Sequence, residues 1–455
     1  MLKKITFCAL WGLSLLSAKV PNLVLIYADD LGYTDLACQG SKFYETPNLD
    51  RLAREGMTFT QAYAGAANCA PSRACLMTGQ YTPRHGIYTV GTSERGKAKH
   101  RMLVPVLNKT VLDARFETMA EALKAAGYRT CVAGKWHLSE DPTKDGFDTN
   151  FGGTTWGHPK SYFSPYKNPY LEDGPKGEHL PERLGREVSN WIKENRGQPF
   201  FAYLPFYSVH TPIQAPAELA AKYSKKKPDG SHRDPKYAAM IESMDAAVGQ
   251  ILKTLDALDL AKETVVIFTS DNGPHGAISR AEPLRGTKGM FYEGGIREPF
   301  LVRYPGVIAA GSKSETPIAQ IDLFPTFLEL AGVGVPDRLD GVSLLPAFKG
   351  EGLAERALFW HFPAYLQSYK ADPDSASKFF RTTPCGVVRK GDWKLIRYFE
   401  DNAVELYNLK EDLSERNNQA EKEPEMTKAL LQELEAWQVA TDAPIPKSRN
   451  PKYEE

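Results

Sequence analysis

The sequence lacks the features that mark a nucleic-acid-binding or membrane-spanning protein. Lys plus Arg and Asp plus Glu both number 56, so the formal net charge is zero and no overall field favours nucleic acid or an anionic membrane. Beyond the first residues, no apolar run is long enough to cross a bilayer, which argues against stable membrane insertion. We also find no internal repeat and no low-complexity tract. An anionic substrate must therefore be bound by a local group of residues.

Cysteine is scarce as well, and its positions fit neither a disulfide framework nor a zinc site. The six cysteines have no regular spacing, and none combines with histidines in a zinc-finger pattern. One or two disulfide bridges in an oxidising compartment and buried free thiols are equally compatible with the sequence. This choice stays open for Cys38, Cys75, Cys131 and Cys385.

The first 18 residues predict a signal peptide. Two lysines precede an apolar run over residues 5–16, and Ser17 and Ala18 offer a cleavage site. The run is too short to anchor the chain comfortably in a bilayer, and Cys8 lies too early in it to suit lipoprotein processing. We therefore predict an exported protein, either periplasmic or secreted.

The remaining chain predicts an α/β fold with a large, mostly parallel sheet. Its composition, 42% hydrophobic and 25% charged over 455 residues, suits one large domain and one smaller domain. Strand-like apolar runs cover residues 22–27, 129–133, 200–204 and 264–269, and they alternate with helical patterns. Such alternation is typical of a sheet with helices on both faces. Apolar residues at helical spacing between Ile241 and Leu258 predict a core helix.

The pattern changes near residue 350, where a smaller C-terminal unit is predicted to begin. Four short strand candidates suggest an antiparallel sheet, and a helical segment closes the chain. The strands are predicted at residues 357–362, 385–389, 393–399 and 404–408, and the helix at residues 423–439. We therefore assign residues 19–350 to a catalytic α/β domain and residues 351–455 to a C-terminal α+β subdomain.

Two acidic pairs follow predicted strands and suggest a metal site. Asp29 and Asp30 come after the first strand, and Asp271 and Asn272 come after the strand at residues 264–269. Ligands of open α/β sheets bind beyond the carboxyl ends of strands, so these side chains are well placed to converge. Because they offer only oxygen ligands, they favour one hard divalent cation, with Ca²⁺ as the first choice and Mg²⁺ as the alternative.

The segment Cys69-Ala70-Pro71-Ser72-Arg73 resembles the signature of formylglycine-dependent type I sulfatases, which belong to the alkaline phosphatase superfamily. The resemblance implies that a transient sulfatase-maturating enzyme oxidises Cys69 to 3-oxoalanine, also called formylglycine. In that family a hydroxyl of the hydrated aldehyde attacks the sulfur of a sulfate ester. The resemblance also implies an alkaline phosphatase-like fold and a cation held by Asp29, Asp30, Cys69, Asp271 and Asn272. Pro71 and Ser72 suit the start of a helix.

Further blocks of the same resemblance follow in order: residues 134–137, 210–212, 284–289 and 293–297. They imply a catalytic set of Cys69, Arg73, Lys135, His137, His210 and Lys288. A sulfate ester is a compact anion that fixed positive charges can stabilise. Arg73, Lys135 and Lys288 are therefore expected to bind sulfate oxygens. By resemblance, His210 and Lys288 assist the leaving alcohol as general acids, His137 deprotonates the second hydroxyl, and Asp271 can accept the proton of the attacking one.

The substrate is less well defined by sequence than the sulfate-binding residues are. Aromatic and polar residues in segments 156–170 and 360–383 fit either a sugar subsite or structural roles. By resemblance to carbohydrate sulfatases, we predict exo-desulfation of a sulfated glycan, with sulfated galactose or N-acetylgalactosamine as first candidates. Two alternatives remain: a phosphodiesterase or phosphonate monoester hydrolase of the same superfamily, and an inactive glycan-binding pseudosulfatase.

Overall fold

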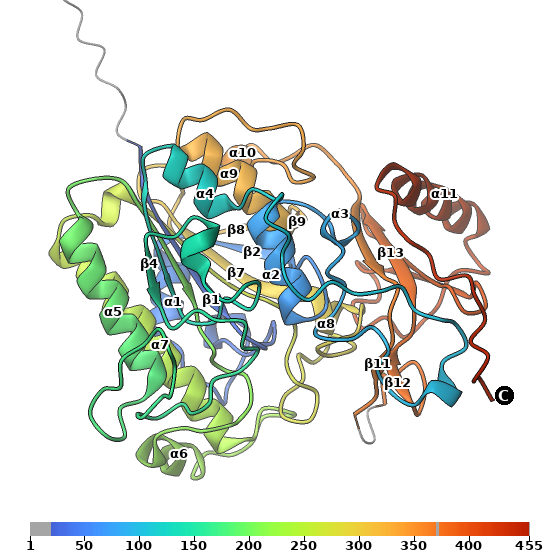
Figure 1. Ribbon diagram of the computed structural model, residues 1–455, viewed down its shortest axis with the longest axis horizontal. Helices are drawn as coiled ribbons and strands as arrows, with labels where there is room; N and C mark the ends of the chain where they lie inside the picture. The colour runs from blue at the N-terminus through green and yellow to red at the C-terminus, as the bar shows by residue number, and fades with distance from the viewer. Residues whose placement is uncertain (1–19, 370–372, 455) are drawn as a thin grey trace, which may run out of the picture.

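The computed structural model describes residues 20–369 and 373–454, and a large mixed sheet forms its centre (Figure 1). Within these residues the sheet has nine strands in the order β4-β3-β5-β1-β6-β7-β2-β8, with β9 paired to β2. The strands are β1 Asn22–Ala28, β2 Met57–Tyr63, β3 Arg129–Ala133, β4 Thr149–Phe151, β5 Phe200–Pro205, β6 Thr264–Ser270, β7 Arg297–Arg303, β8 Ser312–Ser314 and β9 Ile318–Ala319. Strand β1 is parallel to β5 and β6, whereas β7 is antiparallel to β6 and β2. The predicted mixed, mostly parallel sheet is confirmed.

The predicted signal peptide, residues 1–18 with Cys8, lies outside the described residues. In the described ranges, no helix has both the length and the apolar character needed to cross a membrane. The cysteines of these ranges are free thiols: Cys38, Cys69, Cys75, Cys131 and Cys385.

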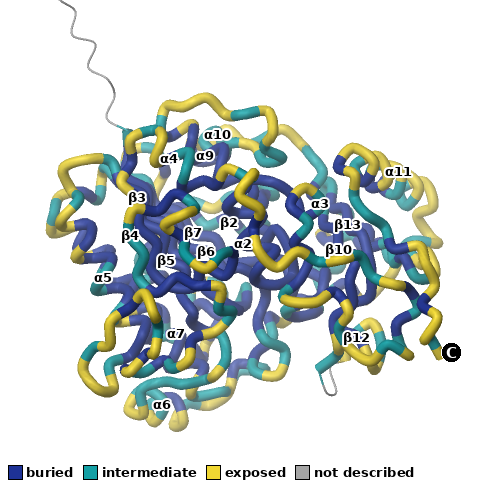
Figure 2. Tube along the Cα trace, in the orientation of Figure 1, coloured by how far each residue is buried: buried dark blue, intermediate teal, exposed yellow. Residues whose placement is uncertain are grey.

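The sheet separates two hydrophobic cores, and its central strand contributes to both. Alternate residues of β1 enter opposite cores: Leu23, Leu25 and Tyr27 on one face, Val24, Ile26 and Ala28 on the other. A strand that is apolar on both faces is expected where helices cover both sides of a parallel sheet. Figure 2 shows the buried strands enclosed by helices that are exposed on their outer sides.

The helices cover the two faces of the sheet in separate groups (Figure 1). One group contains α1 Pro47–Glu55, α5 Leu180–Asn195, α6 Ala217–Tyr223 and α7 Pro235–Ala257, and the other contains α2 Cys69–Thr78, α4 Met119–Ala125, α9 Leu323–Leu330 and α10 Leu345–Phe348. The remaining helical turns are α3 Thr82–His85, α8 Glu293–Ile296, η1 Ala37–Gln39, η2 Ala98–His100, η3 Pro142–Asp145, η4 Ala261–Glu263 and η5 Gln320–Asp322. The predicted core helix is α7, which begins where Asp234 accepts hydrogen bonds from the backbone N–H groups of Lys236 and Tyr237.

The C-terminal part forms a smaller antiparallel sheet, as predicted. Its strands, in spatial order, are β10 Leu358–Phe362, β13 Cys385–Lys390, β14 Trp393–Tyr398 and β15 Val404–Asn408, and the closing helix is α11 Pro424–Ala440. Leu430 and Leu434 of α11 pack against apolar residues of this sheet. A separate pair of short strands, β11 Leu366–Gln367 and β12 Phe380–Thr382, lies beside it. The domain boundary at residue 350 stays a prediction.

A buried cluster of charged residues joins the small sheet to the large one. The Nζ atom of Lys394, on β14, lies 3.0 Å from Glu293 and 2.9 Å from Glu415. Glu293 also accepts hydrogen bonds from Tyr63 at 2.8 Å and from Arg297 at 3.2 Å. Glu293 begins α8, five residues after Lys288, so this cluster fixes the end of the loop that carries this predicted site lysine.

We predict that Lys394→Met lowers the free energy of unfolding by about 3 kcal/mol, because it leaves the buried carboxylate of Glu415 without its cation and leaves Glu293 with Arg297 alone. The matched control is Lys390→Met on the neighbouring strand, whose half-exposed pair with Glu433 should contribute less than about 1 kcal/mol. Chemical denaturation of the two variants measures the difference. Equal losses would show that the buried cluster does not stabilise the junction between the sheets.

Candidate functional site

The two predicted acidic pairs meet at the carboxyl ends of neighbouring strands. Strands β1 and β6 run parallel with Ala28 opposite Ser270, so the residues that follow each strand emerge side by side. The backbone N–H of Asp30 donates to Asp271 Oδ1 at 3.1 Å, and the side-chain amide of Asn272 donates to Asp30 Oδ1 at 2.8 Å. Asp29, Asp30, Asp271 and Asn272 are all at most 1% exposed.

Cys69 lies at the first residue of α2, against the same cluster. Asn68 ends the preceding extended segment, and Cys69 is 2% exposed. As the sequence predicts, Pro71 lies at the start of a helix: it occupies the first turn of α2, where its missing N–H is tolerated. The Nζ atom of Lys288 lies 4.0 Å from the Cys69 sulfur. A group attached at position 69 thus sits near the positive end of a helix and beside a cation.

Three cationic side chains balance the three carboxylates. Lys135 Nζ donates to both oxygens of Asp29 at 2.9 and 2.7 Å, and Lys288 Nζ lies 2.6 and 2.8 Å from the oxygens of Asp30. The guanidinium of Arg73 donates to Asp271 Oδ2 from Nε at 3.0 Å and from Nη2 at 2.8 Å. Its third nitrogen, Nη1, donates to the carbonyl oxygen of Lys135 at 2.6 Å.

Burial of these carboxylates alters their proton affinity. Burial raises the pKa of Asp29 well above its ordinary value, and the neighbouring carboxylates of Asp271 and Asp30 add to this effect against Lys135. For Asp30, burial acts in the same direction, but Lys288 and then His210 hold the pKa below its ordinary value. A further positive charge beside Asp29 would therefore favour its ionised form.

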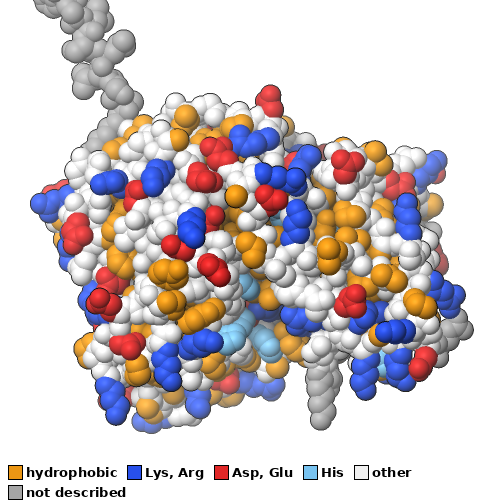
Figure 3. All heavy atoms as spheres, in the orientation of Figure 1, with side chains coloured by type: hydrophobic (Ala, Val, Ile, Leu, Met, Phe, Trp, Pro, Cys, Tyr) orange, Lys and Arg blue, Asp and Glu red, His pale blue; other side chains and the backbone are white. Residues whose placement is uncertain are grey.

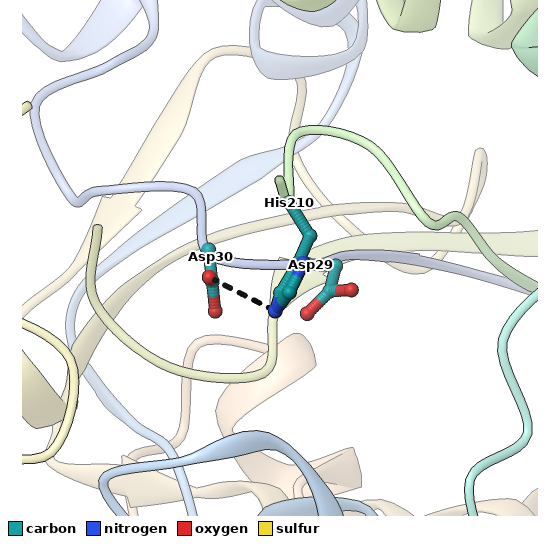
Figure 4. A group of neighbouring side chains, drawn as sticks. All are labelled: Asp29, Asp30 and His210. Atoms are coloured by element: carbon teal, nitrogen blue, oxygen red, sulfur yellow. Dashed lines mark ion pairs between the residues drawn. The ribbon is translucent and has the colours of Figure 1, made fainter. Parts of the chain in front are cut away.

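The residues present fit a hard divalent cation. Asp29, Cys69 and Asp271 each offer a ligand atom, and these atoms lie within 4.8 Å of one another; the same holds for Asp29, Asp30 and His210 (Figure 4). The Oδ1 oxygen of Asn272 is buried and has no hydrogen-bond partner among the described residues. Carboxylate and amide oxygens are the ligands that Ca²⁺ and Mg²⁺ prefer. His210 was not predicted as a ligand; its Nε2 lies 3.6 Å from Asp30 Oδ2.

The surroundings of the two predicted catalytic histidines disfavour the charged form of the imidazole. Burial, with the positive charges of Lys135 and Arg73, lowers the pKa of His137 well below its ordinary value. Burial and Lys288 lower the pKa of His210 as well. The Nδ1–H of His210 is directed at the carbonyl oxygen of Thr211, 2.7 Å away, which leaves Nε2 on the side of Asp30. A neutral imidazole can accept a proton, which is the role predicted for His137.

The backbone at these residues adopts costly conformations. Asp30 and His137 have φ angles of 62° and 67°, in the left-handed region that residues with a Cβ rarely adopt. Gly134 has φ of +118°, and a Cβ there would lie 2.0 Å from the carbonyl oxygen of Pro205. Only glycine allows the turn that brings Lys135 beneath the site. Such strain is concentrated at functional sites.

A pocket of about 320 Å³ opens above the cluster. Figure 3 shows histidine side chains gathered in a hollow of the surface. The lining residues are Asn68, Cys69, Val90, Arg95, His137, Gly157, His158, His210, Thr211, His275, Lys288, Leu366, Gln367, Tyr369 and Arg381. Cys69, His137, His210 and Lys288 thus reach the pocket, whereas Arg73 and Lys135 are fully buried and are absent from this lining.

Segments 156–170 and 360–383, for which the sequence left a sugar subsite and structural roles open, both contribute to the pocket. The first supplies residues 157–158, and the second supplies Leu366, Gln367, Tyr369 and Arg381. Sequence reasoning missed Arg95 and His275. His275 lies three positions after Asn272, and its place on the same loop is a signal that could have identified it. Arg95 lies in a loop without any such signal.

Comparisons with known proteins agree with this geometry. The family profile described as Sulfatase matches residues 21–333, and the profile described as N-sulphoglucosamine sulphohydrolase, C-terminal, matches residues 287–440. A protein of Formosa agariphila named Sulfatase is 34% identical, with 93% of this chain and 90% of that protein covered. Human N-acetylgalactosamine-6-sulfatase is 34% identical, with 75% of this chain and 68% of that protein covered.

Solved structures show the same fold. The crystal structure of Ps i-CgsB in complex with k-i-k-neocarrahexaose has a TM-score of 0.76 and 29% identity, and the match covers 92% of this chain and 93% of that one. The phosphonate monoester hydrolase of Agrobacterium radiobacter has a TM-score of 0.68 at 21% identity, over 92% of this chain and 96% of that one. The latter likeness concerns the fold alone.

We predict that chelation of divalent cations lowers the melting temperature and that added Ca²⁺ restores it, because a ligand at 100 times its Kd stabilises the folded state by about 2.7 kcal/mol. Asn272→Ala and Asp271→Asn should weaken or abolish the restoration. Asp256→Asn, a surface acid paired with Arg51, is the matched control and should respond like the parent protein. If neither the chelator nor Ca²⁺ changes the melting temperature of the parent protein, the metal site is contradicted.

Proposed function

The chain belongs to the sulfatase family and is a sulfuric ester hydrolase, and from this premise we propose that it removes sulfate from sulfated saccharides by means of a formylglycine made from Cys69. The observation that carries the proposal is the place of Cys69: at the start of α2, on the pocket lining, and 4.0 Å from Lys288 Nζ. A nucleophile made at this position has the carboxylate cluster on one side and the pocket on the other.

Two groups supplied after synthesis complete the proposed site. A formylglycine at position 69 would supply, as its hydrate, one hydroxyl for attack on sulfur and a second whose deprotonation expels sulfate. A divalent cation held by Asp29, Asp30, Asp271 and Asn272 would supply positive charge opposite the sulfate oxygens. The side chains of the protein provide the remaining functions.

Lys288 is the side chain best placed to bind the sulfate. It lines the pocket, and although burial acts to lower its pKa, Asp30 holds that pKa above the ordinary value, which favours the charged form. Its charge offsets the negative charge that develops on the ester oxygens. Lys135 forms an ion pair with Asp29, and Arg73 forms one with Asp271, both in the protein interior. We propose that these two residues position the carboxylates and add positive potential.

The histidines and Asp271 are proposed to move protons. Asp271 is within the group of ligand atoms that includes the Cys69 sulfur, so it can take the proton of the attacking hydroxyl. The neutral imidazole of His137 lines the pocket and can deprotonate the second hydroxyl. His210 lies on the pocket lining with Lys288, and we propose that both assist the leaving alcohol as general acids. For His210 this role requires a proton on Nε2, because its Nδ1–H is directed at the carbonyl oxygen of Thr211.

A saccharide is the proposed alcohol. The pocket volume of about 320 Å³ suits a sugar unit, and Tyr369 and His275 present rings that lie 4.4 Å apart. Sulfated galactose or N-acetylgalactosamine remain the first candidates, supported by the human relative named for N-acetylgalactosamine 6-sulfate and by the neocarrahexaose complex. We further propose export to the periplasm or the medium, and transient contact with a maturation enzyme that reaches Cys69.

The two alternatives are less well supported. The phosphonate monoester hydrolase shares the fold at 21% identity, which gives no information on the substrate. A pseudosulfatase would have lost catalytic side chains, whereas Cys69, His137, His210 and Lys288 all line the pocket.

We predict that Cys69 becomes an aldehyde when the protein is produced with a sulfatase-maturating enzyme, and that only the converted protein releases sulfate from sulfated monosaccharides. Peptide mass spectrometry across Cys69 and ion chromatography of sulfate measure the two events. Cys69→Ala and, with a cysteine-specific maturation enzyme, Cys69→Ser should release none. Release at the parent rate by unconverted protein would refute this mechanism, and conversion without release from any sulfate ester would refute the proposed function.

We predict that His137→Ala lowers kcat by about 10²–10⁴-fold, because it removes the proposed general base. The variant should retain the response of its melting temperature to Ca²⁺, since His137 is not among the proposed ligands. The matched control is His100→Ala, a partly exposed histidine outside the pocket lining, which should retain full kcat. A His137→Ala variant with parental kcat would exclude the base role.

A further inference from the structure

The charges on the pocket lining exceed what a single sulfate ester needs. The lining contains the cations Arg95, Lys288 and Arg381, and no Asp or Glu among the described residues contributes to it. Lys288 is paired with Asp30 behind it. Neither arginine has a carboxylate partner in the described part of the chain, so their charges have no counterpart within the pocket.

Arg381 is held firmly in place by backbone carbonyls. It lies on β12 and is 8% exposed. Its Nε donates to the carbonyl oxygen of Gln367 and its Nη1 to the carbonyl oxygen of Lys288, both at 2.9 Å. The Cζ atom lies 3.7 Å from the centre of the Tyr369 ring. A guanidinium with this support is preorganised and loses little freedom when it binds an anion.

Arg381 is separated from the reacting centre by the length of a lysine side chain. It contacts the backbone of Lys288, whereas the Nζ atom at the other end of that residue contacts Asp30 and Cys69. The guanidinium is therefore at the far end of Lys288 from the position where the ester sulfate binds. Its charge can act on a different part of the substrate.

Arg95 brings a second guanidinium to the same part of the pocket from a loop distant in sequence. Its Nη2 donates to the carbonyl oxygen of Val90 at 2.8 Å, and the residue is half-buried. Burial and the charge of Arg95 both lower the pKa of Arg381, against the opposite effect of Tyr369. Arg95 and Arg381 carry the same charge and line the same pocket, so a bound anion would offset their mutual repulsion.

We propose that Arg95 and Arg381 form a second anion-binding subsite, which takes an acidic group, either a carboxylate or a second sulfate, on the saccharide that carries the scissile ester. This inference rests on the proposed function, because it concerns the same substrate. Planar guanidinium groups bind both kinds of acid through paired N–H donors. The preferred substrate is therefore a doubly anionic saccharide.

Binding to the full-length protein with unconverted Cys69 tests this proposal without turnover. Isothermal titration in Ca²⁺ buffer compares monosulfated galactose, N-acetylgalactosamine and glucosamine with the same sugars bearing a second sulfate, and with a disaccharide in which a uronic acid adjoins the sulfated sugar. We expect the best doubly anionic ligand to bind about tenfold more tightly than its monosulfated partner, equivalent to about 1.4 kcal/mol. The disulfated and uronate arms identify which acid is preferred.

The variants Arg381→Gln and Arg95→Gln should each remove most of this tenfold gain, and they should weaken binding of the monosulfated sugar by a much smaller factor. Arg196→Gln, an exposed arginine at the end of α5, is the control and should change neither Kd. The proposal is overturned if no second acid tightens binding, or if the variants weaken both ligands equally. Failure of the proposed function is a separate result, because it appears as absent sulfate release from converted protein.

Discussion

The burial of three carboxylates at the carboxyl ends of β1 and β6 is the constraint on which the rest of the site depends. Asp29, Asp30 and Asp271 are at most 1% exposed, and a buried anion is tolerated only when it is paired and hydrogen-bonded. The protein supplies one cation for each carboxylate, and each cation comes from a different element: α2, the turn after β3, and the loop before α8. The site is therefore complete only when all three elements are packed onto the sheet.

The small C-terminal sheet contributes to the pocket as well as to stability. Lys394 ties β14 to Glu293, at the end of the loop that carries Lys288. The neighbouring β11 and β12 supply Leu366, Gln367 and Arg381 to the pocket, and Arg381 binds the carbonyl oxygen of Lys288. One side of the pocket is thus built from residues after position 350. Substrate selection can change in this part while the carboxylate cluster stays constant.

Local pattern predicted the mostly parallel sheet, the C-terminal antiparallel sheet and the residues at two strand ends, but it did not identify strands β2, β4 and β7. Strands 22–27 and 264–269 end within one residue of the observed β1 and β6, so the acidic pairs were correctly placed in the loops that follow. Contacts between distant segments were beyond local pattern. The sequence around Arg73 does not indicate that its guanidinium would form hydrogen bonds with Asp271. Likewise, the sequence around Arg95 does not indicate that it would line the same pocket as Arg381. These contacts depend on the tertiary packing of segments that are distant in the sequence, which no local pattern specifies.

The hydrogen-bond capacity of the three cations decides which of them can hold a sulfate oxygen. Arg73 directs all three guanidinium nitrogens at Asp271 and at the carbonyl oxygen of Lys135, and it is fully buried. Lys288 has three N–H donors, of which Asp30 takes two, and it borders the pocket. The third is directed at the Cys69 sulfur, 4.0 Å away, which is where the proposed nucleophile and its sulfate ester would lie. These contacts support the proposal that Lys288 binds the sulfate directly and that Arg73 acts through the carboxylate that it holds in place.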